Sequence, residues 1–68
     1  MPLSMVRAGE PNVIKSRRRV RNEKFLENLG FVVGGLVTVV SEINGSLIVN
    51  VKDSRVAIGR DMANKILV

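Results

Sequence analysis

The chain contains no cysteine, histidine, tryptophan or tyrosine, and its only aromatic residues are Phe25 and Phe31. Without cysteine there is no disulfide, and without both cysteine and histidine the zinc-finger spacings are impossible. The serines have no histidine to serve as a base, which a catalytic triad requires. The core must therefore be built mainly from aliphatic side chains. The lack of cysteine fits a cytosolic protein.

A membrane span and a signal peptide are also missing from the sequence pattern. The start, MPLSMVRAGE, has no charged segment followed by a long apolar run. The most apolar stretch, residues 31–40, is ten residues long and is interrupted by two glycines, whereas a span needs about 20 residues. We expect a cytoplasmic protein with no membrane insertion.

The length of 68 residues is enough for a single domain, residues 1–68. A domain of this size buries only about 60% of the surface of its unfolded chain. Apolar residues make up 46% of the chain, which argues against disorder.

The net charge of +5 is concentrated in one segment, KSRRRVRNEK (15–24), which holds six bases and one acid. The other 58 residues hold five of each. A local basic patch of this kind indicates an anionic partner, although a solvated loop and outer helix face is the alternative.

The pattern of apolar residues and turns predicts strands joined by tight hairpins. Asn22 suits the N-cap of a short helix, Glu23–Leu29, and Gly30 suits the position that ends it. Asn44-Gly45 is a two-residue hairpin signal, and we place a second turn at Asp53-Ser54. The predicted strands are 11–15, 36–43, 46–52, 55–58 and 66–68. The fold class is therefore mainly β, a small SH3-like barrel of about five strands with one short helix after the first strand.

The glycines Gly30, Gly34 and Gly35 do not form a phosphate-binding loop in this interpretation. Such loops follow a strand and open a helix, whereas here a helix comes first and a strand follows. We expect these glycines to reverse the chain between helix and strand.

The acidic residues show no spacing typical of catalysis or of a metal site. They are Glu10, Glu23, Glu27, Glu42, Asp53 and Asp61. Because no two of them fall at a close ligand spacing, the sequence names no metal ligand, no cofactor and no catalytic residue. We expect a protein that is not an enzyme.

The order of these features resembles the FeoA family, the small cytosolic ferrous iron transport proteins A. The helix ends in the family's L-x-x-L-G pattern, and a later hairpin has the family's v-x-g-s-r-v-a-L form. The matched positions are Leu3, Gly9, Glu10, Leu26, Leu29, Gly30, Gly34, Val37, Val39, VKDSRVAI (51–58), Ala63, Ile66 and Val68.

The resemblance implies an SH3-like barrel that assists iron uptake by docking on the cytosolic G domain of FeoB, a membrane transporter. It leaves weak association with Fe(II) or another divalent transition metal open. One alternative function is a metal-sensing module like the C-terminal domain of DtxR-type repressors. A nucleic-acid-binding barrel using residues 15–24 is a further alternative, weakened by the lack of aromatic stacking side chains. The candidate partner-binding residues are Arg17, Arg18, Arg19, Arg21, Lys24 and Leu36.

Overall fold

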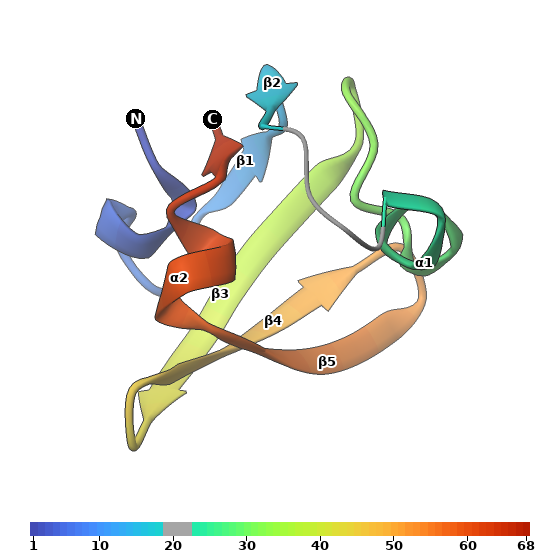
Figure 1. Cartoon of the computed structure of the whole chain (residues 1–68). Helices are drawn as coiled ribbons and strands as arrows, with labels where there is room; N and C mark the ends of the chain where they lie inside the picture. The colour runs from blue at the N-terminus through green and yellow to red at the C-terminus, as the bar shows by residue number, and fades with distance from the viewer. Residues whose placement is uncertain (19–22) are drawn as a thin grey trace.

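The computed structural model describes residues 1–18 and 23–68, and over these residues the chain forms six strands and two short α-helices (Figure 1). The elements are η1 (Leu3–Met5), β1 (Pro11–Val13), β2 (Ser16–Arg17), α1 (Glu23–Leu29), β3 (Leu36–Ile43), β4 (Ser46–Val51), β5 (Ser54–Gly59), α2 (Arg60–Ala63) and β6 (Ile66–Leu67). The mainly β prediction is confirmed. The first α-helix follows the second strand rather than the first, and a second short helix, α2, precedes the last strand.

The strands form two antiparallel sheets around one core. The larger sheet has the order β1-β3-β4-β5, and β2 pairs with β6 in the smaller one. Pro2 bridges to Leu67, and the N–H of Val68 donates to the carbonyl of Met1 at 2.8 Å. The two ends of the chain thus lie side by side (Figure 1). No helix within the described residues is long and apolar enough to cross a membrane.

The predicted strand 11–15 is divided into two, which corrects the sequence interpretation of this region. Ile14 is buried between β1 and β2, and its N–H donates to the carbonyl of Gly35. Lys15 then donates to the carbonyl of Leu67, so that the chain leaves the large sheet and joins the small one. Arg17, which we expected in a loop, therefore lies in β2 opposite Ile66.

The hairpins follow from local backbone preferences. Asn44 and Gly45 have φ of 50° and 81°, as a two-residue turn between β3 and β4 requires. The next turn is made by Lys52 and Asp53, because Ser54 already pairs with Val51. The prediction of that turn at Asp53-Ser54 was wrong by one residue, since sequence alone did not show that Lys52 adopts a positive φ of 56°.

Among the side chains that the structure describes, the core is aliphatic apart from Phe31. Strand β4 alternates as expected, with Leu47, Val49 and Val51 buried. Among the residues whose burial is described, the buried apolar ones are Leu3, Ile14, Leu26, Phe31, Val37, Val39, Leu47, Val49, Val51, Ile58, Ala63 and Ile66. Each element of the fold except the short strands β1 and β2 contributes at least one of these side chains, so the core joins elements from both ends of the chain.

The end of α1 is fixed by the chain reversal at Gly30. The helix spans the predicted residues, and Gly30 has a φ of +108°. A Cβ at this position would lie 3.1 Å from Cβ of Lys52 and from Cγ2 of Val51. Gly30 is therefore required both by its backbone angle and by the close approach of the β4–β5 turn.

We expect Gly30→Ala to destabilise the protein more than Gly34→Ala. Gly34 has a φ of +89° with nothing within 4 Å of an added Cβ, so its substitution costs only the backbone term of about 1 kcal/mol. Gly30→Ala adds overpacking of about 1–3 kcal/mol. Urea unfolding of the two variants measures the difference. Equal losses of unfolding free energy would show that the β4–β5 turn moves away from the added Cβ at no cost in stability.

Candidate partner-binding site

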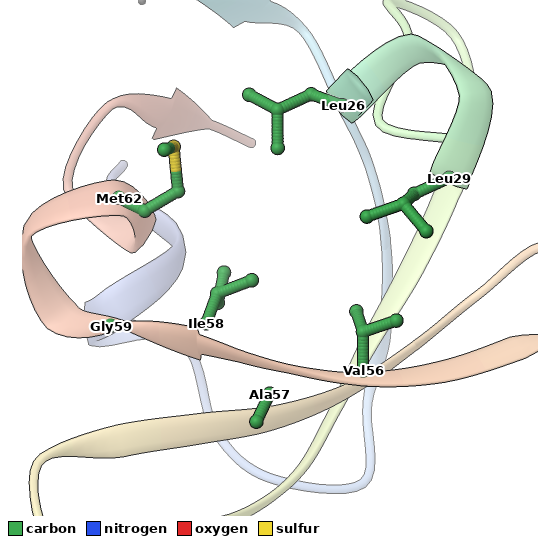
Figure 2. A pocket seen from close by; sticks show the side chains of 7 residues that line it. All are labelled: Leu26, Leu29, Val56, Ala57, Ile58, Gly59 and Met62. Atoms are coloured by element: carbon green, nitrogen blue, oxygen red, sulfur yellow. The ribbon is translucent and has the colours of Figure 1, made fainter. Parts of the chain in front are cut away.

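An apolar groove lies between α1, β5 and α2 and has a volume of about 470 Å³ (Figure 2). Its lining residues are Leu26, Leu29, Val56, Ala57, Ile58, Gly59 and Met62. We call this surface the β5 groove. It is open to solvent on one side and carries no charged side chain in its lining, so it suits contact with apolar groups of another molecule.

The alternation of side chains along β5 and their helical spacing on α1 explain which residues line the β5 groove. Val56 and Ile58 stand at alternate positions of β5 and point toward the helices, whereas Ala57 points to the other side of the strand (Figure 2). Leu26 and Leu29 are three residues apart on α1 and share a face. The alternation of Val56 and Ile58 along β5 agrees with their position toward the core, but it did not reveal that the core is open along this strand. No signal in the sequence marks this opening.

A second apolar surface surrounds Leu36 on the outer face of the large sheet. Leu36 is 61% exposed and pairs across the strands with Val13, which is 49% exposed. The neighbouring loop adds Val32 and Val33, the latter 67% exposed. We call these four residues the outer patch. Contiguous exposed apolar side chains of this kind are typical of an interaction surface.

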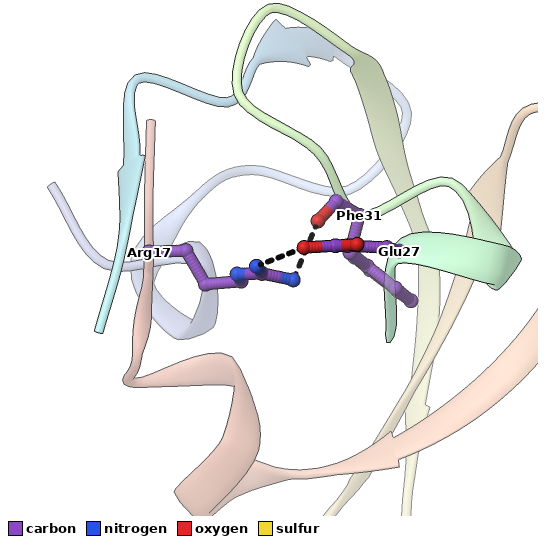
Figure 3. Close-up of polar contacts among 3 residues, drawn as sticks. All are labelled: Arg17, Glu27 and Phe31. Atoms are coloured by element: carbon purple, nitrogen blue, oxygen red, sulfur yellow. Dashed lines mark hydrogen bonds and ion pairs between the residues drawn. The ribbon is translucent and has the colours of Figure 1, made fainter. Parts of the chain in front are cut away.

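Arg17 is held inside the fold rather than presented to solvent (Figure 3). Its Nη1 donates to the carbonyl oxygen of Phe31 at 3.0 Å, and its Nη2 lies 3.3 Å from Oε1 of Glu27. The Arg17 side chain is only 13% exposed, whereas that of Glu27 is 51% exposed. The guanidinium thus connects β2 to the C-terminal end of α1 and to the loop after it.

The other predicted site residues lie on the surface or outside the described residues. Arg18 is exposed, and its N–H donates to the carbonyl of Lys65 at 2.8 Å. Lys24 is exposed on α1. Arg19 and Arg21 lie outside the described residues. Lys24 belongs to α1 and Arg18 is bonded to Lys65 just after α2, so each is attached to a helix that borders the β5 groove. Leu36 belongs to the outer patch.

Within residues 1–18 and 23–68, no three His, Cys, Asp or Glu side chains come together as a ligand set for a metal ion. Two carboxylates are already engaged, Glu27 by Arg17 and Glu42 by Arg60. What the described surface offers is therefore apolar contact in the β5 groove and the outer patch, with basic side chains nearby.

Arg17→Ala is expected to lower the free energy of unfolding by about 1.5–3 kcal/mol, because it removes a charged donor from a part-buried carbonyl. Glu27→Gln removes only the half-exposed ion pair and should cost less than about 0.5 kcal/mol. Urea unfolding of both variants tests this difference. Equal losses of unfolding free energy would mean that the hydrogen bond from Arg17 to the carbonyl of Phe31 adds nothing to stability beyond the ion pair with Glu27.

Comparison with known proteins now identifies the family. The FeoA domain model matches residues 1–68. A curated relative, an Fe(2+) transport protein A of Methanocaldococcus jannaschii, is 32% identical over 68 residues, which cover 98% of this chain and 83% of the relative.

Solved structures share the fold. FeoA of Stenotrophomonas maltophilia, described as a prokaryotic SH3 domain protein and solved in complex with zinc, has a TM-score of 0.84 and 27% identity, covering 100% of this chain and 88% of its own. The iron(II) transport protein A of Clostridium thermocellum has a TM-score of 0.87 at 22% identity, covering 97% of this chain and 43% of its own. The SH3-like fold predicted from the sequence is confirmed. The chain belongs to the FeoA family of ferrous iron transport accessory proteins.

Proposed function

We propose that this protein is a small cytoplasmic accessory protein of ferrous iron uptake that docks on the cytosolic G domain of a FeoB-like membrane transporter. Membership of the FeoA family supports the iron-uptake role. The observation that carries the docking role is the β5 groove, an uncharged apolar surface left open in a domain of only 68 residues. Such a surface is stabilised when a partner removes it from water.

The basic segment adds the electrostatic part of the proposal. Residues 15–24 hold six bases, and the described members Arg18 and Lys24 are exposed. Lys24 belongs to α1, which borders the β5 groove, and Arg18 is bonded to Lys65 just after α2. A basic surface speeds the encounter with an acidic partner and fixes its orientation. Arg17 is assigned a different role, because its guanidinium is already bonded to Phe31 and Glu27.

A divalent transition metal would require oxygen ligands in this chain. The Stenotrophomonas maltophilia relative was solved with zinc. This sequence has neither histidine nor cysteine, and its described carboxylates do not converge. The proposal therefore assigns no metal ligand and attributes the function to protein contact, with Fe(II) as the cargo of the transporter.

Titration of the labelled protein with the purified G domain of the FeoB-like transporter from the same organism tests the proposal. Amide shifts at near-millimolar protein are expected, and their absence would end it. The double variant Arg18→Glu/Lys24→Glu should weaken binding by about tenfold or more, with the larger loss at low salt.

The matched control is the double variant Arg7→Glu/Lys52→Glu. Both of these bases are exposed, lie outside residues 15–24, and give the same change of net charge. The control should retain most of the affinity. Equal weakening by both double variants would show that only overall charge matters and that the basic segment has no specific role.

A further inference from the structure

We propose that the partner binds by adding an extended segment to the outer edge of β5, so that the segment becomes a further strand of the large sheet. Its apolar side chains would enter the β5 groove at every second position, and acidic residues would lie at the end near Arg18, Lys24 and Lys65. This inference rests on the proposed docking function and specifies the kind of partner segment.

Strand β5 has an edge that nothing in the described chain pairs with. It is the terminal strand in the order β1-β3-β4-β5, and within residues 1–18 and 23–68 it pairs with no strand other than β4. The turn at Lys52 and Asp53 makes Val51–Ser54 a hydrogen-bonded pair. Because such pairs alternate, Arg55 and Ala57 direct their N–H and C=O groups away from β4, and Gly59 directs its N–H away, while its carbonyl begins α2 as the N-cap.

These outward backbone groups belong to the wall of the β5 groove. Ala57 and Gly59 are both lining residues, and they carry the smallest side chains in the strand. The approach to their outward backbone groups is therefore not obstructed by their own side chains. An edge of six residues spans about 20 Å, which is the usual length of a strand in a sheet.

An extended occupant matches the β5 groove better than a helix. A helix has already paired its own backbone groups, so packing it here would remove water from the outer N–H and C=O groups of β5 and leave them without partners. Each buried unpaired group costs about 1–3 kcal/mol. A strand satisfies these groups and directs alternate side chains toward Leu26, Leu29 and Met62 (Figure 2).

Charge around the β5 groove indicates acidic residues at one end of the segment. Arg18 and Lys65 meet through a backbone hydrogen bond just beyond α2, and Lys24 lies on α1. The carboxylates of Glu27 and Glu42 are engaged in ion pairs with Arg17 and Arg60. The bases Arg18, Lys24 and Lys65 outnumber the two remaining carboxylates of these helices, Glu23 and Asp61. The net charge of this region is therefore positive, which complements an acidic flank.

Amide hydrogen exchange of the whole protein, alone and with the G domain, tests strand addition. In the complex, the amides of Arg55, Ala57 and Gly59 should exchange at least tenfold more slowly, because they become hydrogen-bonded. The amides of Val56 and Ile58 already face β4 and should change less. If the G domain changes amide chemical shifts but does not slow hydrogen exchange at the three outward amides, strand addition is overturned and the docking function stands. If the G domain changes no amide chemical shift at all, the docking function itself is contradicted.

Ala57→Pro and Ala57→Val form a matched pair of variants at the edge. Proline removes the outward N–H without removing a hydrogen bond to β4, and valine retains that N–H in an exposed side-chain position. The proline variant should lose about tenfold or more in affinity for the G domain, and the valine variant should bind within about threefold of the wild type.

The unfolding midpoint and the spectrum of the β3–β4 hairpin show whether each variant is folded. If the proline variant does not fold, the exchange of the wild-type amides alone decides the question. Unchanged affinity of a folded proline variant would contradict the proposal, as would slowed exchange confined to β1 and the outer patch.

Discussion

The guanidinium of Arg17 connects parts of the chain that share no strand pairing. Arg17 lies in β2, which pairs with β6, and its side chain reaches the carbonyl of Phe31 and the carboxylate of Glu27. The hydrogen bond is part-buried and Phe31 itself has no exposed surface, so this bond fixes the loop beside the core. Together with the buried side chain of Leu26, Arg17 holds α1, and with it one wall of the β5 groove, against the rest of the fold.

The hairpin region was predictable because local signals and burial agree there. The bounds of α1 and β3 and the turn at Asn44 follow from glycine, asparagine and alternating apolar residues. Strands β2 and β6 have only two residues each and depend on tertiary pairing, so no periodicity could reveal β2 within the basic run. The role of Arg17 was hidden for the same reason, because its partner is a backbone carbonyl fourteen residues away.

Of the two candidate surfaces, the outer patch was partly predictable from the sequence and the β5 groove was not. Leu36 was a candidate partner-binding residue from the sequence, and the structure shows it exposed beside Val13, its cross-strand neighbour. The β5 groove could not be anticipated, because Val56 and Ile58 have the same alternation whether their strand is covered or lies at an edge. Only the order of strands in the sheet distinguishes the two cases.

The backbone pairing of Met1 with Val68 and of Pro2 with Leu67 has a consequence for synthesis on the ribosome. Leu3 is fully buried, and η1 packs against α2, so the first residues find their partners only after the last ones have been made. Domains generally fold as units, and here the folded unit is complete only when the first and last residues have paired with each other. The β3–β4–β5 meander can form earlier, during translation, but its core stays open to chaperones and proteases until the final strand has emerged.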